Sequence, residues 1–344
     1  MSFVANTREQ QREMLLSCGV RSMEELFAVI PDNLRVQSFN LPAGKSELEV
    51  FEYLTSLSRR NDARLLYFLG GGVYDHFIPA AVDALAGRGE FYTSYTPYQP
   101  ECSQGTLQAI YEYQSQICRL LEMEVSNASL YDGGTALCEA CGMAFGVTGR
   151  NRIVISGGLN PVYRNMIRTY TANLPIELEE IAPSPGSGSR ETLFHALNEG
   201  TAAVILQNPD FFGIMDDHSD IVECCHARGI LAIQSVYPVA MALLKTPGEM
   251  GMDIVTGEGQ SLGLPLGGGG PYLGLMATTR KLVRKMPGRM VGRTVDRNGR
   301  ESFVLTLQAR EQHIRREKAT SNICTNQSLC ALRAHIYLSL LGRE

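Results

Sequence analysis

The chain has 344 residues, of which 44% are hydrophobic and 19% charged, and its formal net charge at pH 7 is −5. This composition is typical of a globular protein with a large core, and the acidic balance disfavours nucleic acid as a partner. Because the N-terminus is polar and no apolar run approaches the roughly 20 residues of a membrane span, we expect a cytoplasmic protein with no membrane partner.

The first 90 residues are predicted to form an N-terminal helical arm. Residues 6–30 indicate two short helices, because capping residues and helix-ending residues flank each of them. A third helix is predicted over Ser46–Ser58, where apolar residues share one face. A glycine turn then leads into a helix from about Pro79.

A tyrosine-rich segment, FYTSYTPYQPECSQG, occupies Phe91–Gly105. It is too polar and too interrupted by proline for a core strand. It is either a surface loop with its tyrosines packed sideways or a segment that lines a cleft or a subunit contact, since tyrosine offers apolar area and a hydroxyl together. Ser103 can cap the helix that follows.

From here strands alternate with helices, which predicts a large α/β domain over residues 91–285. We expect a mostly parallel seven-stranded sheet with helices on both faces. Its last strand is expected to be antiparallel, because only a loop separates it from the strand before. The predicted strands are Ala128–Tyr131, Arg152–Ser156, Ile176–Ile181, Ala202–Gln207, Ile230–Ile233 and the runs that open at Ile254 and Tyr272. The predicted helices are Ala136–Val147, Asn160–Tyr170, Ser189–Asn198 and His218–Arg228.

Several short stretches look like parts of a site for pyridoxal phosphate (PLP). Gly133, Gly134 and Thr135 open a helix whose free N–H groups could hold a phosphate, although capping alone explains the pattern. PLP enzymes of this kind place an Asp at the end of one strand and a Schiff-base lysine near the end of the next. The first position carries Gln234 and the second carries EGQS, up to Ser261.

No lysine lies between Lys245 and Lys281, although four glycines at 267–270 form the kind of loop that often follows the PLP lysine. A neutral amide cannot hold a proton on the pyridine nitrogen as a carboxylate does, and neither Gln nor Ser can form the imine. Both PLP anchors are therefore missing. An independent PLP decarboxylase or aminotransferase that uses Lys245 or Lys281 is the alternative. A nucleotide-binding module that uses one of the glycine turns is weaker still, because neither turn is a GxGxxG that opens a helix.

Beyond residue 280 the sequence becomes basic and rich in amides, with REQHIRREKATSNICTNQ as its most distinctive part. The uncharged, hydroxyl-rich end of this stretch suits a subunit interface or a structural hinge. A helix is predicted over Gln327–Leu341, so that residues 286–344 are expected to lead to a C-terminal domain absent from this sequence. The interface candidates are His313, Arg316, Lys318, Thr320, Ser321 and Asn322.

The nine cysteines are expected to be reduced thiols within helices and strands. Cys138 and Cys141 form one CxxC in an alanine-rich helical stretch, and no second pair accompanies them. A zinc or redox site there is the weaker interpretation, and we predict no metal site.

Four motifs together resemble the P-protein of the glycine cleavage system, in its subunit 1 form: YTPYQPE, NASLYDGGTA, MPGRMVG and REQHIRREKATSNICTNQ. The resemblance covers the chain from about residue 1 to 344. It implies PLP-dependent transferase fold type I, with the PLP lysine on subunit 2. It puts Gln234 at the Asp position and Ser261, or Gln260, at the lysine position. The run GGGGP departs from subunit 1 toward subunit 2, but glycines alone supply no imine.

The same resemblance implies the activity and the partners. Subunit 2 joins glycine to PLP, CO2 leaves, and the aminomethyl group passes to the lipoyl arm of the H-protein. The chain would form a pair of heterodimers with subunit 2, a heterotetramer, and would be inactive alone. It would complete the partner's cleft and the channel for the lipoyl arm, or only hold the interface together. The candidate residues for this role are Tyr95, Thr96, Tyr98, Gln99 and Glu101.

Overall fold

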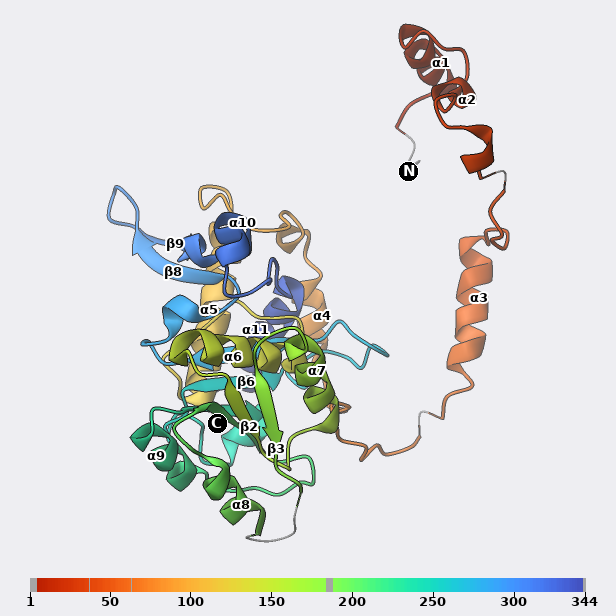
Figure 1. Ribbon diagram of the computed structural model, residues 1–344. Helices are drawn as coiled ribbons and strands as arrows, with labels where there is room; N and C mark the ends of the chain where they lie inside the picture. The colour runs from red at the N-terminus through yellow and green to blue at the C-terminus, as the bar shows by residue number, and fades with distance from the viewer. Residues whose placement is uncertain (1–4, 37, 63, 184–187, 343–344) are drawn as a thin grey trace. The chain divides into compact units, whose positions relative to one another are not determined.

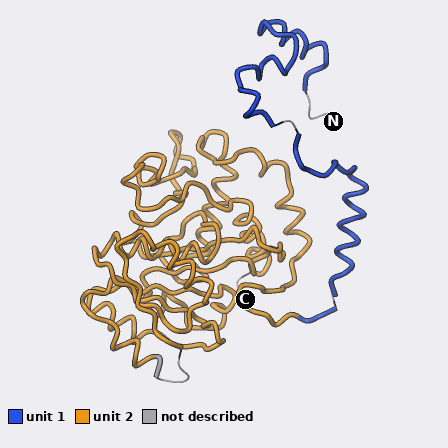
Figure 2. Tube along the Cα trace, turned by 45° about the vertical axis from the view of Figure 1, so that its right-hand side comes forward, with its two compact units in different colours: residues 1–66 blue, residues 67–344 orange. Residues whose placement is uncertain are grey.

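A computed structural model describes residues 5–36, 38–62, 64–183 and 188–342. The chain forms two compact units, Met1–Leu66 and Tyr67–Glu344, which Figure 2 shows in different colours. The domain boundaries predicted at residues 90 and 285 fall inside the second unit and stay predictions. None of the helices in the described ranges is long and apolar enough to cross a membrane.

The first unit consists of short helices. Its helices are α1 (Arg8–Ser17), α2 (Met23–Leu26) and α3 (Glu47–Ser58). Reciprocal capping boxes begin two of them: Thr7 with Gln10 at α1 and Ser46 with Glu49 at α3. Among the residues described in this unit none is buried. Local capping is therefore what defines these helices within the unit, and the sequence predicted all three.

The second unit is built on a seven-stranded sheet with the strand order β1-β7-β6-β5-β4-β2-β3. Its strands are β1 (Val125–Ser126), β2 (Arg152–Ile155), β3 (Glu177–Glu180), β4 (Thr201–Asn208), β5 (Leu231–Val236), β6 (Ile254–Glu258) and β7 (Gly274–Thr278). The strands from β2 to β6 pair in parallel, whereas β7 runs antiparallel to both β6 and β1. The predicted fold class is confirmed, including the antiparallel last strand.

Helices cover both faces of this sheet (Figure 1). On one face α6 and α7 bury Leu137 and Ile167 against alternate strand residues such as Ile205. On the other, α5, α9 and α11 bury side chains such as Tyr113 against Val255. The helices of this unit are α4 (Ala80–Ala86), α5 (Gln104–Leu121), α6 (Gly133–Thr148), α7 (Pro161–Thr171), α8 (Gly188–Ala196), α9 (Ser219–Ala227), α10 (Gln312–Arg315) and α11 (Ser328–Leu341).

The first predicted strand is wrong by a few residues. The ladder with β7 is made by Val125 and Ser126, while the predicted stretch contributes only an isolated bridge from Leu130 to Gly274. Ser129 has a φ of 124°, which takes the chain out of the extended conformation. The apolar residues there are buried without forming a regular strand.

A two-stranded hairpin, β8 (Met290–Val295) and β9 (Glu301–Thr306), was not predicted from the sequence. It packs through Phe303 and Leu305 on Leu107 of α5. Much of its surface is polar and exposed, so the alternation of buried and exposed residues is short. The basic region after residue 280 therefore contains ordered structure that belongs to the second unit.

Candidate functional site

A cavity of 270 Å³ lies where three neighbouring parallel strands end, and we call it the strand-end cavity. Gln207 of β4, Ser235 of β5 and Glu258 of β6 line it together with Asn160 and Tyr163, which belong to the start of α7. The carboxyl ends of parallel strands are where open α/β sheets bind their ligands. This cavity is therefore the candidate site of the chain's own fold.

The N-terminus of α6 faces Glu258 rather than open space. The N–H of Gly133 donates to Glu258 Oε2 at 2.9 Å, and the other carboxylate oxygen accepts from the N–H groups of Gln260 at 2.9 Å and Leu273 at 3.0 Å. We call these three N–H groups the anion seat. Burial raises the pKa of Glu258 to about 7, although the three hydrogen bonds act in the opposite direction.

The glycines of the predicted phosphate loop are needed for close packing. A Cβ on Gly133 would lie 2.7 Å from the Tyr163 hydroxyl and 2.9 Å from the backbone nitrogen of Glu258. A Cβ on Gly134 would collide with the Met166 side chain. Thr135 donates its N–H to Asp132 at 2.8 Å, so a capping interaction is present at this helix start. The loop keeps the shape of an anion site, and Glu258 fills it.

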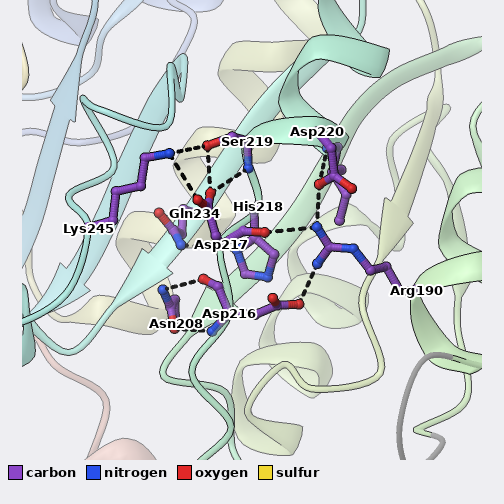
Figure 3. A network of polar contacts seen from close by, with 10 residues as sticks. Arg190, Asn208, Asp216, Asp217, His218, Ser219, Asp220, Gln234 and Lys245 are labelled. Carbon is purple, nitrogen blue, oxygen red and sulfur yellow. Dashed lines mark hydrogen bonds and ion pairs between the residues drawn. The ribbon is translucent and has the colours of Figure 1, made fainter.

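Gln234 stands in β5 and is completely buried. Its Nε2 lies 3.3 Å from Nδ1 of His218 (Figure 3), and within the described structure its Oε1 has no hydrogen-bond partner. Ser235, the next residue, lines the strand-end cavity instead. Successive side chains of a strand point to opposite faces, so the Gln234 side chain lies on the face opposite to that of Ser235.

Gln260 and Ser261 are buried after the end of β6. The Gln260 Nε2 donates to the Leu264 carbonyl at 2.8 Å. In the described part of the chain neither Gln260 Oε1 nor the Ser261 hydroxyl has a hydrogen-bond partner. The position predicted for a lysine therefore carries neutral, enclosed side chains.

The two flanking lysines lie outside the cavity. Lys245 is held at the surface, where its Nζ donates to Asp217 at 2.9 Å and to Ser219 at 2.8 Å (Figure 3). Lys281 is exposed and follows β7. Because β7 is antiparallel to β6, its end lies at the edge of the sheet opposite to the cavity. This placement disfavours the alternative in which either lysine forms an imine there.

Two predicted segments that are distant in the sequence meet around Tyr98. The Arg289 Nη2 donates to the Tyr98 hydroxyl at 3.2 Å, and the guanidinium lies 5.6 Å from the centre of the ring. The same ring packs edge-on against His313, with centroids 6.2 Å apart. Arg289 is buried and belongs to the MPGRMVG motif, but the sequence does not show that its side chain meets Tyr98.

The tyrosine-rich loop also lines a second cavity, of 480 Å³, which we call the tyrosine-loop cavity. Tyr95 lies on one side of it, Tyr113 of α5 lines it from within the core, and Asn326 lines it from the segment before α11. Thr96, Gln99 and Glu101 do not line this cavity; the first is half-buried and the other two are exposed.

The remaining interface candidates are at the surface. His313, Arg316, Lys318, Thr320 and Asn322 are exposed, and Ser321 is half-buried. The Ser321 hydroxyl accepts the N–H of Ile323 at 3.0 Å, a local turn interaction. Both a subunit interface and a solvent-facing surface would have exposed residues in the single chain, so exposure is compatible with either.

The cysteines are all free, and Cys138 and Cys141 are buried in α6. Across the described ranges no group of three or more His, Cys, Asp or Glu side chains is placed to hold a metal ion.

The fold and the position of the strand-end cavity are those of the PLP-dependent transferases of fold type I. A solved structure of sphingosine-1-phosphate lyase from Burkholderia pseudomallei shares this fold, with a TM-score of 0.58, 13% identity, and coverage of 90% of this chain and 72% of that one. A family model, "Glycine cleavage system P-protein", matches residues 1–344. The chain belongs to the glycine cleavage system P-protein family.

Individual relatives agree with this family and confirm the resemblance. "Probable glycine dehydrogenase (decarboxylating) subunit 1" of Geotalea uraniireducens is 60% identical over 344 residues, which are 100% of this chain and 78% of that protein. A crystal structure of glycine decarboxylase (P-protein) of the glycine cleavage system, in inhibitor-bound form, matches with a TM-score of 0.91 and 44% identity over 99% of this chain and 77% of that one. The chain has the role of a P-protein subunit.

PLP belongs to the chemistry of this fold, but the strand-end cavity does not fit it. The described residues that line the cavity include no lysine. Glu258 holds the N–H groups that a phosphate would need, and the expected Asp position carries the neutral amide of Gln234, which contacts His218. No reaction step is therefore assigned to PLP in this chain.

Proposed function

We propose that this chain is the P-protein subunit that does not hold PLP, and that a partner subunit, subunit 2, binds the cofactor and decarboxylates glycine. The observation that carries this proposal is the strand-end cavity, which has no lysine among its described lining residues and a carboxylate in its anion seat. When bound, PLP supplies the electron sink for loss of CO2. This chain's own residues would shape the partner's cleft.

The tyrosine-rich loop is the part of the chain that we assign to the partner's cleft. The buried guanidinium of Arg289 fixes the Tyr98 hydroxyl, so that ring is held in one orientation. Tyr95 lies beside the tyrosine-loop cavity with 79% of its surface exposed, which leaves it free to contact a ligand or a second chain. Gln99 and Glu101 are exposed in the same loop, and Thr96 is half-buried. These residues would position glycine or the lipoyl arm and exclude water.

We further propose that the chain pairs with subunit 2 in a pair of heterodimers and that the lipoyl group of the H-protein accepts the aminomethyl group. The exposed residues between His313 and Asn322 are the proposed contact surface. Support comes from their contact with the tyrosine-rich loop, since His313 packs on Tyr98. An interface placed there would adjoin the residues assigned to the cleft.

Absorbance spectroscopy of the purified chain with PLP tests which chain holds the cofactor. We expect no imine band, and no cofactor fixed to this chain after borohydride reduction, because the cavity offers no amine. A stoichiometric, reducible imine on this chain would contradict the proposal. Co-expression with a candidate subunit 2 completes the test: glycine-dependent CO2 exchange is expected only when both chains are present.

A further inference from the structure

Glu258 makes an unusual set of contacts for a residue at the end of a strand. Its carboxylate is buried and accepts three backbone N–H groups that come from separate segments, the start of α6, the turn after β6 and the residue before β7. At the same time the side chain lines the strand-end cavity. It therefore lies between that cavity and the N-terminus of a 16-residue helix.

We propose that Glu258 is an internal anion that occupies a latent oxyanion site, and that it keeps phosphate compounds, PLP included, out of this chain. The inference rests on the proposed function, in which the cofactor belongs to the partner. The site takes one oxyanion group, and the carboxylate on Glu258 is the occupant built into the chain. Its removal exposes a seat whose ligand class is a phosphate monoester or inorganic phosphate.

The geometry of the seat supports this assignment. The helix N-terminus offers partial positive charge as well as a free N–H, and two further N–H groups converge on the same carboxylate. Gly133 has no room for a side chain, so the backbone can approach the anion closely. Three converging donors that have lost their acceptor are unfavourable when buried, and an oxyanion that enters from the cavity would satisfy them.

Thermal unfolding of the full chain with Glu258→Ala tests the proposal. The assay uses inorganic phosphate against chloride at matched ionic strength, above about pH 8, where Glu258 of the unaltered chain is ionised. We expect phosphate to raise the Tm of the variant by several degrees in a saturable way and to leave the Tm of the unaltered chain unchanged. An equal response of the two chains would overturn the proposal.

Glu249→Ala is the matched control. Glu249 also accepts a backbone N–H through its carboxylate, that of Thr246 at 2.9 Å, but it lies in a turn away from the cavity. Its removal should create no response to phosphate. Glu258→Gln is the second control: its side chain still occupies the volume of the seat, although its amide has one acceptor oxygen instead of two, and it should respond much less than Glu258→Ala.

PLP and pyridoxal, which lacks the phosphate, separate recognition of the phosphate from recognition of the ring. The Glu258→Ala chain should bind PLP reversibly, with no product after borohydride, and should bind pyridoxal at least tenfold more weakly. Equal binding of both would contradict a phosphate seat. An imine on the unaltered chain would instead contradict the proposed function, so the two failures are distinct.

If the Glu258→Ala chain does not fold in the absence of phosphate, the proposal can still be tested. Refolding yield is then measured in phosphate and in chloride. Recovery in phosphate supports the latent seat, whereas equal failure in both salts contradicts it.

Discussion

At the scale of single residues, burial and hydrogen bonding act in opposite directions on the ionisation of Glu258. Desolvation raises its pKa from 4.5 to about 7, and the neighbouring Asp132 at the cap of α6 adds to the rise. Tyr163 of α7 and Tyr113 of α5, which interact with the same carboxyl group, also have raised pKa values and stay neutral over this range. Stability should therefore depend on pH through this carboxyl group, in addition to other groups whose pKa values are shifted by burial, such as Glu139 and His218.

The sign follows from proton uptake. An unfolded chain releases the Glu258 proton near pH 4.5, whereas the folded chain keeps it until about pH 7. The contribution of this group to the free energy of unfolding should fall across that window as pH rises, by at most about 3 kcal/mol. Urea denaturation at several pH values, compared with Glu258→Gln, measures it. If the difference in the free energy of unfolding between the two chains did not change with pH, Glu258 would not be the titrating group.

A second prediction at this scale concerns Gly133. Replacement by Ala should destabilise the fold by about 1–3 kcal/mol, because the new methyl group meets the Tyr163 hydroxyl and the Glu258 backbone. Gly142→Ala in the same helix is the control: its Cβ meets nothing within 4 Å, and the change should be neutral or slightly stabilising. Equal effects of the two substitutions on denaturant midpoints would show that the close packing of Gly133 against Tyr163 and Glu258 does not contribute to stability.

At the scale of elements, the β8–β9 hairpin joins the basic segment to the core. Phe303 of β9 packs on α5, and the Gln104 side chain at the start of α5 bonds to the Phe303 N–H at 2.8 Å and carbonyl at 2.9 Å. Phe303→Ala should cost about 3 kcal/mol of stability. Val295→Ala, at an exposed position of the same hairpin, should cost less than about 0.5 kcal/mol. Thermal unfolding of both variants checks the difference, and a similar loss in each would contradict the packing.

Elements with strong local signals were predictable. The strand β4, with a continuous apolar run, and α6, which Asp132 caps, lie where the pattern puts them. The first strand was misplaced because Ser129 breaks an apolar stretch through its backbone conformation, which composition does not reveal. The hairpin was missed because its alternation of buried and exposed residues is short, with only Phe303 and Leu305 buried in β9 and the end of β8 exposed.

At the scale of the whole molecule, contacts between distant segments could not be predicted. The sequence shows directly that the two PLP anchors are missing, because position 234 carries Gln instead of Asp and no lysine lies near position 261. The carboxylate of Glu258 in the anion seat and the contact of Arg289 with Tyr98 depend on the folded chain. Sequence reasoning therefore gave the candidates, and folding determined which of them meet.

One prediction concerns the assembled enzyme. Tyr98→Phe removes the acceptor of the Arg289 hydrogen bond beside the proposed cleft, and it should lower glycine-dependent CO2 exchange by the complex about tenfold without changing its PLP content. Tyr170→Phe, an exposed position on α7, is the control and should leave exchange unchanged. Unchanged exchange in Tyr98→Phe would show that this hydroxyl does not act in the cleft. If the variant no longer assembled with subunit 2, its role would be in the interface only.

We propose that the cofactor lies on the partner subunit, and this can be tested on the assembled enzyme. The most direct measurement is borohydride reduction of the complete complex with PLP, followed by mass spectrometry of the peptides from both chains. We expect one reduced phosphopyridoxyl-lysine, on the partner subunit, with none at stoichiometric level on this chain. A stoichiometric label on this chain, at Lys245, Lys281 or any other lysine, would contradict it.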